Sequence, residues 1–269
     1  GYDFGNMDND PAPVLPGAAQ AHGTSVSGVA AGSYIEAGDF IGGAAPDAKI
    51  YALKFSEDAT GGLTNDGGAA SWDWCVTHKY DDPTNPILVI SNSWGAAIPL
   101  NDEALADAIN PLEAQAAKNC VAAGMIVVVA TGNNYFKDGI GIPAANSNTI
   151  AVGAVSDAAG VGEGITAPGM VMPYSNTGIL LDVFAPANCT TTADIVGANG
   201  YDAGNWMSCF AGTSCATPYV SGVIAVLQQA SFEKTGSYLT QSEVLQLFKL
   251  RSEERRVGKE CKTRWSAYD

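Results

Sequence analysis

The chain has 269 residues, 46% of them hydrophobic, which is enough to bury the core of one large domain or two small ones. Its formal net charge of −15 argues against a sequence-independent nucleic-acid binder, because such a protein needs a basic face for the phosphates. No run of about 18 apolar residues is present, so no membrane span is predicted, and residues 1–11 have the composition of a polar loop rather than of a signal peptide.

The predicted elements alternate between short β-rich runs and longer Ala-rich helical runs. In chain order they are a helix that opens within residues 21–32, a strand at 48–55, a helix at 67–80, a strand at 86–95, a helix at 101–124 that Pro111 interrupts or restarts, strands at 125–133 and 149–155, and a helix at 213–230. Residues 239–250 are predicted to start an amphipathic helix, with a capping box formed by Thr240 and Glu243. Continuous apolar strands separated by helices predict the α/β class, with a doubly wound, mainly parallel sheet and helices on both faces.

The basic residues are unevenly distributed. Residues 1–250 contain seven Lys and no Arg, whereas residues 251–269 contain all four Arg. This tail, RSEERRVGKECKTRWSAYD, resembles a translated sequencing adapter, so we expect it to be non-native and exclude it from fold reasoning. The alternative is a solvated basic helix or interaction tail.

Three segments place polar residues where strands end and helices begin, which is where active and binding sites form in doubly wound sheets. His22 is predicted at a helix start, Asn133 ends a strand, and Ser214 begins a helix whose first turn is expected to hold Pro218. A serine at a helix N-terminus lies beside free backbone N–H groups, which stabilise a developing oxyanion. These positions therefore indicate acyl-transfer chemistry.

Four motifs in this order, HGTSVSG, SNSWG, ATGN and GTSCATPYVSG, resemble the subtilisin-like serine proteases, or subtilases. The resemblance implies that His22 is the general base, Ser214 the nucleophile and Asn133 a donor of the oxyanion hole. It implies a serine endopeptidase acting through an acyl-enzyme. A serine esterase of the α/β-hydrolase type is disfavoured, because the chain has no histidine after Ser214.

The same resemblance implies a substrate-binding site. Its members are Ser93, Trp94 and Gly95, which would pair with the substrate backbone, and Ala130, Thr131, Gly132 and Gly141. Gly141 and the neighbouring Ile142-Pro143 match the wall of the primary specificity pocket, where the family often has a cis proline. The absence of carboxylates from these motif positions predicts an apolar primary pocket and broad specificity for a peptide or protein substrate.

One departure from the family pattern concerns the catalytic Asp, which should lie about thirty residues before His22. Asp3, Asp8 and Asp10 are present, but none follows an apolar strand, so we assign none of them this role and expect the catalytic Asp to be absent from this chain. We therefore expect residues 1–250 to be a subtilase catalytic domain truncated at both ends, and nearly inactive. A peptide-binding pseudoprotease is the alternative.

The resemblance also bears on cysteines and metals. A Cys189–Cys209 disulfide and, with less support, a Cys75–Cys120 disulfide suit a secreted protease, whereas Cys215 is expected to be a buried thiol. No cofactor is required. Subtilases often carry structural calcium, so the three N-terminal aspartates are either calcium ligands or solvated loop acids. We expect a secreted monomer.

Overall fold

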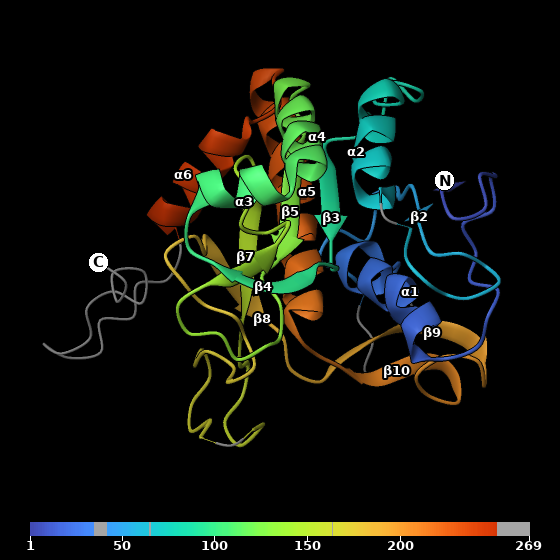
Figure 1. The fold of residues 1–269 in the computed structure, drawn as a ribbon, viewed down its shortest axis with the longest axis vertical. Coiled ribbons are helices and arrows are strands. Elements are labelled where there is room, and N and C mark those ends of the chain that lie inside the picture. The colour runs from blue at the N-terminus through green and yellow to red at the C-terminus, as the bar shows by residue number, and fades with distance from the viewer. Residues whose placement is uncertain (35–41, 65, 163, 252–269) are drawn as a thin grey trace, which may run out of the picture.

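The computed structural model describes residues 1–34, 42–64, 66–162 and 164–251, so the tail predicted to be non-native lies almost wholly outside the described residues. Its centre is a sheet covered by helices on both faces (Figure 1). Within the described ranges, no helix is long and apolar enough to cross a membrane.

The central sheet contains four parallel strands. They are β3 (Val89–Asn92), β5 (Ile126–Ala130), β7 (Ile150–Val155) and β8 (Val183–Pro186), hydrogen-bonded in the order β3-β5-β7-β8. Every residue of β5 is buried, as its unbroken apolar sequence requires for a strand covered on both sides. The predicted α/β class and parallel sheet are confirmed.

The two faces of the sheet belong to two separate cores, because successive residues of a strand point to opposite faces. Val128 of β5 packs in one core with Ile224, and Val127 packs in the other with Trp72. The first core is covered by α1 (Ala18–Ala31), α5 (Thr213–Thr235) and α6 (Gln241–Arg251), and the second by α2 (Gly67–Thr77), α3 (Glu103–Ile109) and α4 (Pro111–Ala122).

Local signals account for two helix boundaries. Pro111 occupies the first turn of α4, so the predicted break in the 101–124 helix is confirmed. Thr240 and Glu243 form the predicted capping box of α6, with Thr240 N–H donating to Glu243 Oε2 at 2.8 Å and Glu243 N–H donating to Thr240 Oγ1 at 3.3 Å.

The predicted strand at 48–55 is wrong in length and placement. Only β2 (Leu53–Lys54) forms, and it pairs in parallel with β1 (Tyr2–Asp3) in a separate two-stranded sheet. Ile50, expected to be buried, is 50% exposed. In the described part of the chain, β3 is therefore an edge strand of the central sheet, hydrogen-bonded to β5 on one side only.

Two small antiparallel sheets were not predicted. One pairs β4 (Ala96–Leu100) with β6 (Ile140–Ile142), and the other pairs β9 (Thr190–Gly197) with β10 (Gly204–Phe210). The strands of the first sheet, AAIPL and IGI, are apolar but short and contain proline or glycine. Those of the second, TTTADIVG and GNWMSCF, mix polar and apolar residues without the alternation that marks a strand in sequence.

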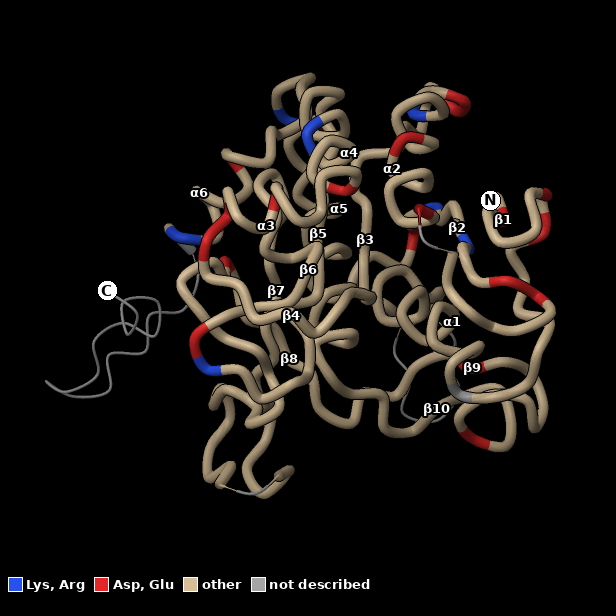
Figure 2. Tube along the Cα trace, in the orientation of Figure 1, with Lys and Arg blue, Asp and Glu red and all other residues tan. Residues whose placement is uncertain are grey.

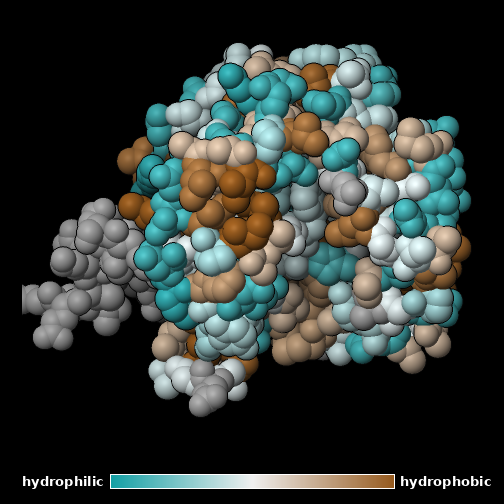
Figure 3. Space-filling view, viewed as in Figure 1, coloured by the Kyte–Doolittle hydropathy of each residue, from teal (hydrophilic) through white to brown (hydrophobic). Residues whose placement is uncertain are grey.

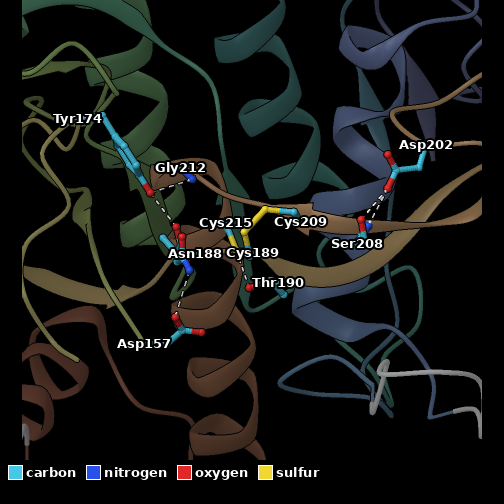
Figure 4. The surroundings of a disulfide bond; sticks show 11 residues. Asp157, Tyr174, Asn188, Cys189, Thr190, Asp202, Ser208, Cys209, Gly212 and Cys215 are labelled. Carbon is cyan, nitrogen blue, oxygen red and sulfur yellow. Dashed lines mark hydrogen bonds between the residues drawn. A yellow bond between two sulfur atoms is a disulfide. The ribbon is translucent and has the colours of Figure 1, made fainter. Parts of the chain in front are cut away.

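The disulfide predicted between Cys189 and Cys209 is present and joins the two ends of the β9–β10 hairpin (Figure 4). The alternative Cys75–Cys120 bridge is not formed. Both thiols are buried and free, and Cys120 Sγ lies 3.5 Å from the Trp72 carbonyl oxygen. Cys215 is a buried free thiol, as predicted.

Candidate active site

The serine predicted as nucleophile lies at the start of α5. Gly212, with φ of 91°, turns the chain into the helix, and Ser214 follows in the first turn. The structure corrects the expected place of Pro218, which lies inside the helix beyond its first turn. Since proline has no N–H, it leaves the Ser214 carbonyl without its helical donor, and Ser93 Oγ donates to that carbonyl at 2.9 Å.

The hydroxyl and the backbone N–H of Ser214 lie close together at the start of α5. Its Oγ lies 3.4 Å from the Ser93 carbonyl oxygen, on the side of the helix that faces β3. Its backbone N–H has no acceptor among the described residues, as expected for the first turn of a helix. This N–H and the positive end of the α5 dipole lie beside the hydroxyl.

Asn133 follows the carboxyl end of β5 and is held by the start of α5. Its Oδ1 accepts hydrogen bonds from Thr213 N–H at 2.9 Å and from Thr213 Oγ1 at 3.0 Å. The Thr213 hydroxyl also accepts the Gly132 N–H at 3.2 Å. Because both donors engage the amide oxygen, the Asn133 Nδ2 group remains available as a donor.

His22 lies in α1, one turn after the helix begins at Ala18, and not at its start as expected. Its ring packs edge-on against Phe210, with 5.7 Å between ring centroids. Burial lowers the pKa of His22 from its usual 6.5, so the ring is neutral at pH 7. Among the described residues, the His22 side chain forms no hydrogen bond and no ion pair, and the Ser214 hydroxyl donates to the Ser93 carbonyl instead of to its ring.

The three N-terminal aspartates lie elsewhere. Asp3 is fully buried in β1 and forms an ion pair with Lys54 at 2.6 Å, and it accepts the Gly5 N–H at 2.7 Å. Asp8 and Asp10 are exposed and accept nearby backbone N–H groups. In the ranges that the structure describes, no three His, Cys, Asp or Glu side chains converge in a way that could hold a metal ion. Asp3 is thus a buried ion-pair partner and not a solvated loop acid.

The substrate-binding residues predicted from sequence come together around one cavity of about 280 Å³. It is lined by all seven of them, namely Ser93, Trp94, Gly95, Ala130, Thr131, Gly132 and Gly141, together with Asn133 and Ser214. His22 does not line it. The Ile142–Pro143 peptide bond beside Gly141 is cis, as the resemblance implies.

Sequence reasoning missed four further lining residues, which are Ala96, Ala97, Asn134 and Thr213, whereas Ile142, predicted as part of the pocket wall, also lines the cavity. Two of them lie on β4, which no sequence pattern indicated. Thr213, however, stands inside the GTS motif, and its position before the nucleophile was an available signal.

Charge and hydropathy differ between the cavity and its surroundings. None of the residues that line the cavity is charged, and Figure 2 shows acidic residues around the periphery while the central strands carry none. Figure 3 shows exposed apolar side chains over α3 and β4, which include Ile98, Leu105 and Ile109. This apolar surface continues from the part of β4 that lines the cavity.

Comparisons with known proteins agree with this geometry. The Subtilase family matches residues 2–257. A subtilisin-like protease of Coccidioides posadasii (strain C735) is 34% identical over 216 residues, covering 80% of this chain and 44% of that protein. An intracellular serine protease of Paenibacillus polymyxa is 28% identical over 230 residues, covering 83% of this chain and 58% of that protein.

Among solved structures, Sphericase has a TM-score of 0.69 at 25% identity, covering 93% of this chain and 74% of that one. A cold-adapted subtilisin-like serine proteinase has a TM-score of 0.66 at 23% identity, covering 96% of this chain and 76% of that one, which shows the shared fold. The chain spans about half the length of the two curated relatives described. On the extent of the family match, it belongs to the Subtilase family.

Proposed function

We propose that the protein is a serine endopeptidase that cleaves peptide bonds through an acyl-enzyme on Ser214. The observation that carries this proposal is the arrangement at the start of α5. A serine with a free backbone N–H lies beside an asparagine whose amide oxygen is held by Thr213, at one end of an uncharged cavity. Two donors are thereby preorganised where an oxyanion would develop.

In the proposed reaction, Ser214 Oγ attacks the carbonyl carbon of the substrate and its proton passes to His22. The Ser214 N–H and Asn133 Nδ2 donate hydrogen bonds to the oxyanion. When the C–N bond breaks, His22 returns the proton to the leaving amine, and water then hydrolyses the ester by the same route. A substrate strand would lie along Ser93–Gly95 by main-chain pairing.

We propose that the primary pocket accepts apolar side chains. Its walls are built from Ala130, Thr131, Gly132 and Gly141, whose side chains are small and uncharged. A pocket with no carboxylate cannot offset the desolvation cost of burying a charged Arg or Lys side chain. We therefore expect preference for large uncharged side chains at the cleaved bond and broad specificity otherwise.

We propose that no described residue supplies the carboxylate that would orient His22. Two observations support this proposal. No described carboxylate bonds to the His22 ring, and the free side of the edge strand β3 could pair with a further strand. Without that carboxylate the imidazolium is not stabilised, and we expect turnover to fall on the order of 10⁴-fold.

The lack of a carboxylate at His22 also favours a second candidate, a pseudoprotease that binds peptides without cleaving them.

We also propose that the endopeptidase is secreted. The Cys189–Cys209 disulfide supports secretion, because such bonds persist in oxidising compartments. Subtilases often carry structural calcium, but the described residues offer no cluster of three ligating side chains for it, and no step of the proposed reaction uses it.

A fluorophosphonate probe tests the proposal, since it forms an O–P bond with an activated serine as fluoride leaves. We expect the wild type to be labelled at Ser214. The Ser214→Ala variant should not react, while Ser221→Ala, a matched change further along α5, should react normally. Peptides with Phe or Leu at the cleaved bond should have higher kcat/KM than peptides with Arg. Peptide binding without labelling would support the pseudoprotease instead.

A further inference from the structure

A buried segment outside the recognised motifs, Tyr174–Asn176, contacts both halves of the proposed oxyanion site. It precedes β8 and runs beside the loop that carries Asn133. Tyr174 is half-buried, and Ser175 and Asn176 are fully buried. The proposed reaction gives this segment no role, although its polar side chains are all engaged.

Asn176 fixes the loop of Asn133 with its whole side chain. Its Oδ1 accepts the Asn134 N–H at 2.8 Å and the Phe136 N–H at 3.2 Å, and its Nδ2 donates to the Thr131 carbonyl at 2.9 Å. A Cβ atom at Gly132, where φ is 99°, would lie 2.5 Å from this Nδ2. The amide therefore occupies the space that a side chain at Gly132 would need.

Tyr174 reaches the other half of the site. Its hydroxyl accepts the Gly212 N–H at 3.2 Å and donates to the Ala187 carbonyl at 2.7 Å, as Figure 4 shows for the tyrosine and glycine. Gly212 is the residue that turns the chain into α5, so this hydrogen bond fixes the backbone just before Ser214. The Tyr174 carbonyl also accepts the Tyr135 N–H at 3.0 Å.

The residue between them ties the segment to the central sheet. Ser175 Oγ accepts the Ala154 N–H of β7 at 3.0 Å, and the Met172 N–H donates to the Ala154 carbonyl at 2.9 Å. The segment is thus held by a rigid strand on one side, while its neighbouring side chains hold the Asn133 loop and the start of α5.

We propose that Tyr174 and Asn176 are positioning residues that set the relative placement of Ser214 and Asn133. This inference rests on the proposed function. The physical reason is that an oxyanion site contributes to the rate only when its donors and the nucleophile are fixed before the reaction. Ser214 and Asn133 lie on different elements, and this segment joins them through one buried network.

The test compares Tyr174→Phe with Tyr219→Phe in the intact chain. Each variant deletes one half-buried hydroxyl, but the Tyr219 hydroxyl contacts Thr190 Oγ1 at 3.3 Å and no active-site residue. Labelling by the fluorophosphonate probe is measured over a range of probe concentrations, which separates the maximal rate from probe affinity. Amide hydrogen exchange of Gly212 is measured by NMR in the same samples.

Tyr174→Phe should lower the maximal labelling rate by about tenfold with unchanged probe affinity, and should speed Gly212 exchange by about the same factor. Tyr219→Phe should change neither. Asn176→Asp, which keeps the shape but loses both amide donors, should lower the maximal rate by more than about tenfold. Equal effects of the two tyrosine variants, or unchanged Gly212 exchange in Tyr174→Phe, would overturn the inference.

The two proposals can fail separately. If the wild type is not labelled at all, the proposed reaction is refuted, and Gly212 exchange still decides whether Tyr174 holds the start of α5. If the wild type is labelled and Tyr174→Phe and Asn176→Asp are labelled at the same maximal rate, the reaction stands and the positioning role is wrong.

Discussion

Removing the Cys189–Cys209 disulfide should lower stability by an amount that follows from its position in the chain. The bond closes a loop with a sequence separation of 20 residues. In the chain-entropy account, cross-linking a loop of this length restricts the unfolded chain and contributes about 3 kcal/mol to the free energy of unfolding. For a domain of this size, a loss of about 3 kcal/mol corresponds to a fall in Tm of about 10 °C.

The assay is thermal unfolding of the wild type and of the Cys189→Ser/Cys209→Ser double variant at one scan rate, each with and without dithiothreitol. The reductant should lower the Tm of the wild type to that of the double variant and leave the double variant unchanged. Cys75→Ala, which keeps the bridge, should keep the response to reductant. A wild-type Tm that does not respond to reductant, with reduction verified by thiol titration, would refute the reasoning.

The bridge should matter for the site as well as for stability. Cys209 directly precedes Phe210, whose ring contacts His22, and the chain then reaches Gly212 and Ser214. In the double variant at a temperature where it remains folded, we expect slower fluorophosphonate labelling of Ser214. Labelling at the wild-type rate would show that the hairpin does not contribute to placing either residue.

Two further predictions concern pH. Burial lowers the pKa of His22 below 6.5, so the labelling rate should have its acidic midpoint below pH 6.5, because only the neutral ring accepts a proton. A midpoint above 6.5 would indicate a carboxylate beside the ring. Burial raises the pKa of Asp182 to about 6, so the folded state binds a proton on this carboxyl more tightly than the unfolded chain does. The free energy of unfolding that this binding contributes is lost as pH rises from the usual pKa of 3.8 through about 6. Asp182→Asn, which can still accept the Ala151 N–H, should therefore raise Tm relative to the wild type at pH 8 and leave it nearly unchanged at pH 4. Equal changes in Tm measured by calorimetry at both pH values would contradict this.

Elements whose formation depends on one local signal were predictable from sequence. The apolar run of β5, the break at Pro111 and the capping box at Thr240 each appear where the sequence indicated. The β9–β10 hairpin was missed because its strands are rich in threonine, glycine and polar residues and lie at the surface. Its pairing depends on tertiary contacts and the Cys189–Cys209 bridge, which periodicity does not report.

The candidate site likewise contains residues that the sequence motifs predicted and supporting residues that they did not. Ordered motifs placed Ser93, Asn133 and Ser214 together because each motif ends or begins an element at one edge of the sheet. The residues that hold them, such as Tyr174 and Asn176, lie outside those motifs. Their roles consist of hydrogen bonds to distant backbone groups, so no spacing in the sequence marks them.

Pro218 makes two distant positions depend on each other. Because it cannot donate to the Ser214 carbonyl, that carbonyl is satisfied by the Ser93 hydroxyl, and the nucleophile helix is thereby attached to the end of β3. If residue 218 had an N–H, the helix would satisfy the carbonyl internally, and the hydrogen bond from Ser93 would no longer be its sole partner. We therefore expect the loss of the Ser93 hydroxyl to cost less when residue 218 has an N–H, and grafting either residue alone into another scaffold would transfer only half of the attachment.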